Sequence, residues 1–527
     1  MKTLRYLSIA LLFALAPVGA FQTAEPVDAA ANAKIRDEGL NRSKVNEPFD
    51  MFVNQIGPRL TGSPSHKRAA DWARDTMTKW GLSNSHLEPW EFGRGWELEK
   101  LTIEMVEPRY MPLLGYAEAW TPSTSGEVVL NAVSTADKTP EQIAAMADKI
   151  KGSALLAQPV ITAFIDKDRE QPELVPGARI GAPAAPRQGG PGNAGRGAVG
   201  VASAPNPALT AAVLIKPSRG MQGTVFIQGG RETPAATQPA VILAAEHYNI
   251  VERLLEAGTP VKLRVNVKTK FYETDRNSYN VIAEIPGTDP VLKNEVVLLG
   301  GHLDSWHTAT GATDNADGAA AVMEALRIIK ASGLQPKRTI RVALWSGEEQ
   351  GLLGSAAYVR DHFGDRQTMQ LKPEHAKLSA YFNLDNGSGK IRGIYCEDNA
   401  AVAPIFREWL APFADLGATL VTLNRTGGTD HESFDDVGLP AFQFVQDELE
   451  YETRTHHTNM DLYERLQKND LMQASAIMAA FAYNAAMREG MIPRKPMPKD
   501  EPAKAEPAKA APAPAPVKAP EKAAPHH

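Results

Sequence analysis

From residue 278 to about residue 489 the sequence alternates between short apolar runs and segments with helical spacing. The run at 296–299 is continuously apolar, as in a strand buried on both faces. After it, Val322, Leu326 and Ile329 recur at helical spacing. Such alternation predicts an α/β domain in which helices flank a mostly parallel, mixed central sheet.

Histidine and carboxylate side chains follow the predicted strands of this region. In chain order they are His302 and Asp304, Asp314, Glu348 and Glu349, Asp385, and His457. In an open α/β sheet, ligands bind in the crevice beyond the carboxyl ends of the strands. We therefore expect these residues to converge on one edge of the sheet, although each motif alone is more often turn, cap or surface chemistry.

The residue types suit zinc, because imidazole and carboxylate are good ligands for it. The single cysteine, Cys396, is interpreted as a small buried hydrophobic residue. Three carboxylates and two histidines exceed the needs of one tetrahedral ion. They fit two ions about 3.5–4 Å apart if one carboxylate bridges them.

Two spacings suggest further roles. His302 and Asp304 are two residues apart, so on an extended backbone they point the same way, and Asp304 can accept the second imidazole N–H. Glu348 and Glu349 are adjacent and point in different directions. One can bind metal while its neighbour acts as general base.

Together these residues resemble peptidase family M28. The segments that carry the resemblance are 300–305 (GGHLDS), 311–318 (GATDNADG), 346–351 (SGEEQG), 383–385 (NLD) and 457–461 (HTNMD). The run from 300 to 352 is most similar to the carboxypeptidase Q-like branch of secreted dipeptidases.

The resemblance implies a role for each residue. His302 and Asp385 would bind one zinc ion, Glu349 and His457 the other, and Asp314 would bridge them, with Glu348 as base and Asp304 as orienting residue. His457 is preferred over His456 because it directly precedes Thr458. Residues 427–431 (GGTDH) resemble a loop that borders the substrate, which makes Asp430 and His431 candidate substrate contacts.

The rest of the chain divides by composition. Lys2 and Arg5 precede an apolar run and a small-residue cleavage site, the pattern of a secretory signal peptide. The predicted division is a signal peptide at 1–20, the start of the catalytic domain at 21–116, a β-rich insert at 117–272 that resembles a protease-associated domain, the zinc peptidase domain at 273–493, and a disordered tail at 494–527. A Gly/Pro-rich stretch at about 183–207 is predicted to be a mobile loop.

The predicted function is hydrolysis of terminal peptide bonds in small peptides by an exported, periplasmic or extracellular two-zinc aminopeptidase or dipeptidase. A net charge of −6 gives no reason to expect nucleic acid as a partner, and no membrane span is expected after signal cleavage. Carboxypeptidase activity on the same scaffold is the first alternative. A non-catalytic receptor-like module and a glutaminyl cyclase-like acyltransferase are the others.

Overall fold

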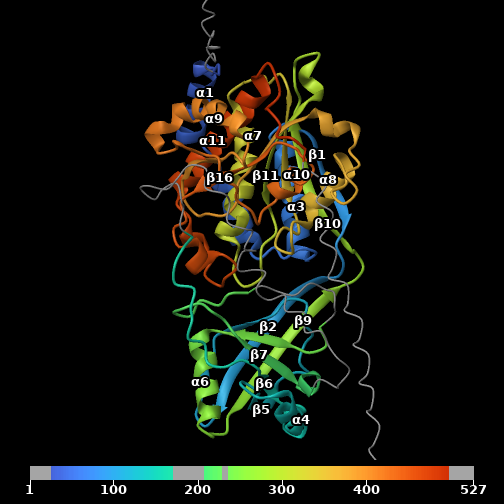
Figure 1. Ribbon diagram of the computed structural model, residues 1–527, viewed down its shortest axis with the longest axis vertical. Coiled ribbons are helices and arrows are strands. Elements are labelled where there is room, and N and C mark those ends of the chain that lie inside the picture. Colours follow the sequence, from blue (N-terminus) through green and yellow to red (C-terminus); the bar gives the residue numbers. More distant parts are fainter. Residues whose placement is uncertain (1–24, 170–206, 228–235, 498–527) are drawn as a thin grey trace, which may run out of the picture.

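The computed structural model describes residues 25–169, 207–227 and 236–497, and these ranges form two units stacked along the long axis (Figure 1). Each unit is built around an eight-stranded sheet. The predicted signal peptide, the predicted mobile loop up to residue 206 and the tail from residue 498 lie outside the described residues.

The first sheet is mixed, with a parallel centre. Its strand order is β1-β10-β12-β11-β13-β16-β14-β15, and the pairs β12–β11, β11–β13 and β13–β16 are parallel. The strands are β1 (Ser83–Glu91), β10 (Asn277–Ile285), β11 (Val296–His302), β12 (Thr339–Trp345), β13 (Leu378–Asn383), β14 (Ile391–Tyr395), β15 (Leu420–Thr422) and β16 (Ala441–Gln446).

Helices cover both faces of this sheet. One core cluster unites the sheet with α1 (Ala29–Asn41), α2 (Asn46–Asp50), α3 (Pro64–Lys79), α7 (Asp317–Ala331), α9 (Ala403–Leu410) and α11 (Lys468–Met487). A second cluster packs α8 (Leu353–His362) and α10 (His431–Asp435) on the opposite face. The predicted α/β class, with helices around a mostly parallel mixed sheet, is confirmed.

The second unit is inserted in the chain between β1 and β10, two neighbouring strands of the first sheet. The antiparallel pair β1 and β10 ends with Glu91 opposite Asn277, and the chain between these residues builds the second sheet. Its strands are β2 (Gly95–Glu107), β3 (Met111–Pro112), β4 (Gly115–Ala117), β5 (Val128–Ser134), β6 (Ala154–Leu156), β7 (Val213–Pro217), β8 (Ala240–Leu243) and β9 (Lys262–Tyr272), accompanied by α4 (Pro140–Ala145), α5 (Ala147–Ile150) and α6 (Ala245–Glu256).

The second sheet starts earlier in the chain than the sequence suggested. Strands β2, β3 and much of β4 come before residue 117, and β2 pairs with β9 along most of its length. The domain division and the protease-associated character of this unit stay predictions.

Residues 223–227 (GTVFI) have a β-rich composition but form no named strand. Within the described ranges, Phe226 makes a single bridge to Thr458, in the first unit. The backbone N–H groups of Val225 and Ile227 donate to Asn459 and to His457, so this segment bonds to a loop of the first unit instead of to the second sheet.

Short helical turns complete the described chain: η1 (Met51–Ile56), η3 (Pro207–Thr210), η4 (Leu292–Asn294), η5 (Ala312–Ala316), η6 (Pro373–Lys377), η7 (Ala400–Val402), η8 (Ala411–Leu416), η9 (Tyr451–Thr455) and η10 (Tyr463–Arg465). The first residues of the predicted tail are packed, since Arg494 donates to the backbone of His375 and Leu378. Within the described ranges, no helix has both the length and the apolar composition needed to cross a bilayer.

Trp409 fills the aromatic core on the α9 and α11 side of the first sheet. It is fully buried and its ring lies 5.6 Å from Phe406 and 5.4 Å from Phe481. Trp409→Ala is expected to lower the free energy of unfolding by about 3–5 kcal/mol, because it removes contacts that the surroundings cannot fully replace. Urea denaturation followed by circular dichroism measures the loss. Val291→Ala, at an exposed site, is the control and should change the free energy of unfolding by less than about 0.5 kcal/mol. Equal losses of stability in the two variants would contradict the packing of Trp409 described above.

Candidate metal centre

The candidate metal ligands lie at one edge of the first sheet. His302 is the last residue of β11, Glu348 and Glu349 follow β12 by a short turn, and Asp385 follows β13. Because β12, β11 and β13 are neighbouring parallel strands, their carboxyl ends lie side by side. The expected convergence of these segments is present in the structure.

The first group forms around His302. Its Nε2 lies 3.2 Å from Asp314 Oδ1, 3.7 Å from Asp385 Oδ1 and 3.8 Å from Glu348 Oε2. Potential ligand atoms of His302, Glu348 and Asp385 all lie within 4.8 Å of one another. Three buried side chains from three strand ends therefore meet at one point.

The second group forms around His457. Its Nε2 lies 2.8 Å from Glu349 Oε2 and 3.4 Å from Asp314 Oδ2. Asp314 thus turns one carboxylate oxygen toward each histidine. This arrangement places Asp314 between the two groups, as a bridging ligand requires.

His456 also lies near this second group. A potential ligand atom of His456 is within 4.8 Å of those of Asp314 and His457. Its Nδ1, however, faces Glu452 Oε2 at 3.4 Å, and its ring stacks on Tyr451. The contact with Glu349 is made by His457, the histidine preferred from the sequence.

Asp304 contacts both His302 and the turn that carries Glu348 and Glu349, and the second contact was not predicted from the sequence. The Nδ1 of His302 lies 2.9 Å from the backbone oxygen of Asp304 and 3.6 Å from its carboxylate. The carboxylate instead accepts the backbone N–H groups of Glu348 and Glu349, each at 3.3 Å. Asp304 therefore positions both the histidine and the turn that carries the two glutamates.

Asp461 fixes the turn η5 that carries Asp314. Its Oδ1 accepts the backbone N–H of Thr313 at 2.8 Å, and its Oδ2 accepts that of Asp314 at 3.1 Å. Burial, reinforced by the charge of Asp314, raises the pKa of Asp461 to about 7. Asp461 ends the motif at 457–461, but no role for it was predicted from the sequence.

Excess negative charge dominates the electrostatics of the site. Burial raises the pKa of Glu348 and of Glu349 well above the usual value, and the charge of Asp314 adds to this effect on Glu349. Although burial opposes it, the charges of Glu348 and Asp385 raise the pKa of His302 well above its usual range. Bound cations would supply the positive charge that these carboxylates need and would lower the pKa values of the acids.

The donor atoms fit metal ions. Both carboxylate oxygens of Glu349, the Oδ2 of Asp314 and the Nε2 of His302 are buried and make no well-aligned hydrogen bond within the described ranges. Asp314, Glu349 and His457 line a small cavity together with Trp306 and Asp461. Buried polar atoms need partners, and imidazole and carboxylate atoms that converge on a cavity suit zinc-type ions.

Asp430 and His431 lie at the start of α10 and are buried. His431 Nε2 is 3.5 Å from Glu397 Oε1, a residue outside the predicted set. Although burial opposes it, Glu397 raises the pKa of His431, whereas burial raises that of Asp430 to about 7. Their roles as substrate contacts stay predictions.

Two positioning residues in the N-terminal segment, Arg59 and Thr61, were not predicted from the sequence. Arg59 is fully buried and donates to five backbone oxygens, including those of Leu303 at 2.7 Å and Gly311 at 2.9 Å. Thr61 donates to Asp304 Oδ2 at 2.8 Å and accepts the N–H of Gly347 at 3.1 Å. Neither residue lies in a repeating pattern, so no sequence signal could have identified it.

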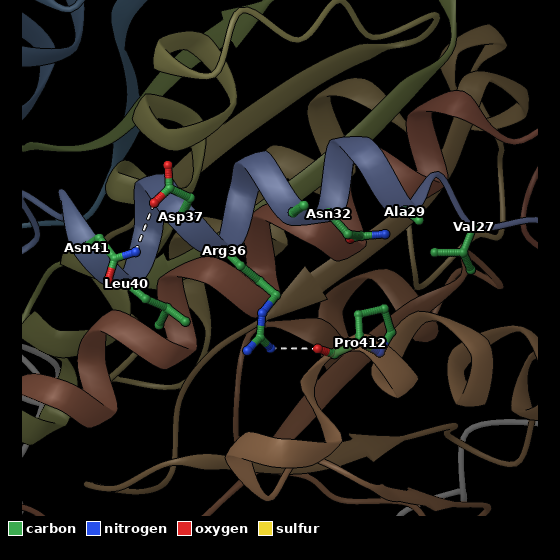
Figure 2. Close-up of a pocket in the computed structure, with 9 residues that line it drawn as sticks. Val27, Ala29, Asn32, Arg36, Asp37, Leu40, Asn41 and Pro412 are labelled. Atoms are coloured by element: carbon green, nitrogen blue, oxygen red, sulfur yellow. Dashed lines mark hydrogen bonds between the residues drawn. The ribbon is translucent and has the colours of Figure 1, made fainter.

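A second, wider cavity lies in another region. It runs along α1, from Val27 to Asn41, and Arg36 crosses it to reach the backbone oxygen of Pro412 at 2.6 Å (Figure 2). None of the candidate metal ligands lines it. The candidate metal ligands therefore lie at the sheet edge, apart from this cavity.

Comparison with known proteins gives one family and several whole-chain likenesses. Residues 280–482 match the model of peptidase family M28. Carboxypeptidase Q of Mus musculus is 27% identical over 460 residues, which is 86% of this chain and 88% of that protein.

Solved structures support the fold. The crystal structure of a peptidase M28 precursor from Shewanella amazonensis SB2B has a TM-score of 0.66 at 23% identity and covers 89% of this chain and 98% of its own. A zinc aminopeptidase from Bacillus subtilis has a TM-score of 0.56 at 19% identity and covers 84% of this chain and 95% of its own.

Thr61→Val tests the hydrogen bonds that hold the glutamate turn. It leaves the N–H of Gly347 without its buried partner and removes one of the two hydrogen bonds to Asp304 Oδ2, which should lower the free energy of unfolding by about 1–3 kcal/mol. The matched control is Thr78→Val, which removes an exposed hydroxyl that donates to the backbone oxygen of Arg74 in the same helix, and which should change stability by less than about 0.5 kcal/mol. Equal stabilities of the two variants in urea denaturation would refute this role of Thr61.

Proposed function

Because residues 280–482 belong to peptidase family M28, we propose that this protein is a two-zinc exopeptidase that removes residues from the ends of small peptides, as an aminopeptidase or dipeptidase. One observation carries the proposal. The two oxygens of Asp314 face two separate groups, one around His302 and one around His457. A single metal ion would not need a carboxylate shared in this way.

The proposed ligand sets follow from these contacts. His302 and Asp385 would hold one zinc ion, Glu349 and His457 the other, and Asp314 would bridge them. When bound, the two ions would polarise the scissile carbonyl group and make the attacking water more acidic. The zinc assignment is supported by the imidazole and carboxylate donors and by the likeness to a zinc aminopeptidase.

Glu348 is proposed as the general base. It lies beside His302 in the first group, while its neighbour Glu349 faces the second. Glu348 would take a proton from water as the water oxygen attacks the carbonyl carbon. It would then deliver that proton to the amine nitrogen as the peptide C–N bond breaks, so that one water is consumed per bond.

Asp304 and Thr61 would keep this base in place. The carboxylate of Asp304 accepts the backbone N–H of Glu348, and Thr61 bonds to both Asp304 and Gly347. The base therefore sits on a turn tied to the end of β11. Such positioning preserves the geometry that proton transfer requires.

Carboxypeptidase activity is the second candidate. A specific observation favours it, since a relative that spans 86% of this chain is named carboxypeptidase Q. A receptor-like module and a glutaminyl cyclase-like acyltransferase are disfavoured, because all five proposed ligands and the proposed base are present. We further propose that the chain is exported to the periplasm or the cell exterior and that the second unit is a protease-associated domain.

Glu348→Gln separates the base from the ligands. Glutamine keeps the size of the side chain but cannot take up a proton, so turnover should fall by at least about 10²-fold. Zinc content, measured by mass spectrometry of the dialysed protein, should stay at two ions per chain. Glu349→Gln is the comparison and should lose zinc as well as activity. Loss of zinc from Glu348→Gln with full retention in Glu349→Gln would reverse the assignment.

A panel of free, N-blocked and C-blocked dipeptides defines the specificity. An aminopeptidase or dipeptidase needs a free α-amine, so N-blocked substrates should not be cleaved, and a zinc chelator should abolish hydrolysis of the free dipeptides. Hydrolysis of N-blocked but not C-blocked dipeptides would establish the carboxypeptidase instead. Hydrolysis that survives complete zinc removal would contradict the proposed mechanism.

A further inference from the structure

The loop that carries His457 is strained. Within residues 449–459, here called the metal loop, three non-glycine residues have left-handed backbones: Leu449 (φ 49°), Glu450 (φ 64°) and His457 (φ 58°). Each such residue costs about 1–3 kcal/mol and persists only where its surroundings hold it. Contacts from outside the loop must therefore stabilise this conformation.

Asp168, a residue of the second unit, supplies one set of these contacts. Its Oδ2 accepts the backbone N–H of Glu450 at 2.7 Å, and its Oδ1 accepts the N–H and the hydroxyl of Thr453 at 3.1 and 2.9 Å. Three donors of the first turn of η9 are thus satisfied by one carboxylate, in the manner of a helix cap. Glu450, one of the strained residues, is held directly.

Residues 221–227 of the second unit supply the other set. Ile227 donates its backbone N–H to the carbonyl oxygen of His457 at 2.8 Å. Val225 donates to Asn459 Oδ1 at 2.7 Å, and Arg454 donates to Thr224 Oγ1 at 3.0 Å. The backbone of a proposed metal ligand is therefore bonded directly to the second unit.

A series of charged contacts connects the second unit to the histidines of the metal loop. Arg169 pairs with Glu452, and Glu452 faces Nδ1 of His456 at 3.4 Å. The ring centroids of His456 and His457 are 3.9 Å apart. The second unit thus reaches both histidines of the metal loop.

We propose that the second unit positions His457, so that the zinc position formed by Glu349, His457 and the bridging Asp314 depends on Asp168, whereas the position around His302 and Asp385 does not. The His302 position is built on the strand ends of the first sheet. The His457 position is built on a strained loop whose conformation is set from the second unit. Asp168 is accordingly a positioning residue, and this inference rests on the proposed two-zinc function.

Asp168→Ala tests the inference in the full-length, zinc-loaded protein. Zinc remaining on the chain is measured against increasing chelator. One of the two ions should leave at a chelator concentration at least about tenfold lower than in the wild type, the size of effect known for residues that orient metal ligands. The other ion should leave at the wild-type concentration.

The matched control is Asp365→Ala. Asp365 accepts the backbone N–H of Gln367 and both the N–H and the hydroxyl of Thr368 through one oxygen, a similar capping pattern in an exposed turn of the first unit. It should release both ions as the wild type does, and the metal-free melting temperatures of the two variants should match. If Asp168→Ala does not fold, Thr453→Val carries the same prediction, with selective loosening of at least about threefold, since it removes one of the hydrogen bonds to Asp168.

Three outcomes overturn the inference. Asp168→Ala could hold both ions as tightly as the wild type, which would show that the metal loop does not need this contact. It could loosen both ions equally and lower the metal-free melting temperature, which would show a general loss of stability. A wild-type chain that holds fewer than two zinc ions would instead contradict the proposed function itself, and the inference with it.

Discussion

Negative charge buried around Asp314 is the constraint on which the rest of the site depends. Asp314, Glu348, Glu349 and Asp385 are brought together at a sheet edge, in contact with the imidazoles of His302 and His457. Like charges in a buried site repel strongly unless cations lie among them. The strand ends, the turn η5 held by Asp461 and the metal loop together keep these carboxylates in place.

Much of this arrangement could be predicted from the sequence. The continuous apolar run at 296–299 identified β11, and the helical spacing of Val322, Leu326 and Ile329 identified α7, because buried strands and helices leave a strong local signal. The candidate ligands come directly after such runs or in the loops between them. For parallel strands, that position alone predicts a shared edge.

Contacts between distant segments could not be predicted in the same way. Thr61 and Arg59 act on the β11 end from more than 240 residues away, and Asp168 acts on the metal loop from 282 residues away. Residues 223–227 have a β-rich composition, yet the backbone N–H groups of Val225 and Ile227 bond to the metal loop. The second sheet begins at Gly95, before the compositional change near residue 117, because β2 pairs with β9 from Gly95 to Glu107. Tertiary pairing decides these features, and composition carries no record of it.

The two units therefore contribute differently to one site. The first carries most of the proposed ligands at its strand ends, and the second, inserted between β1 and β10, contacts the loop that carries His457, the last of the proposed ligands. Precise placement of ligands requires support from outside the ligand set itself. Thr61 and Asp461 hydrogen-bond to the backbone of the turns that carry the candidate ligands, and Asp168 is proposed to act in the same way on the metal loop.

The most direct measurement is X-ray anomalous scattering at the zinc edge, from crystals of the wild-type protein grown with zinc. We expect two anomalous peaks about 3.5–4 Å apart, one on the His302 side and one on the His457 side of Asp314. A single peak, or the absence of any peak within bonding distance of the Asp314 oxygens, would contradict the proposed two-zinc site.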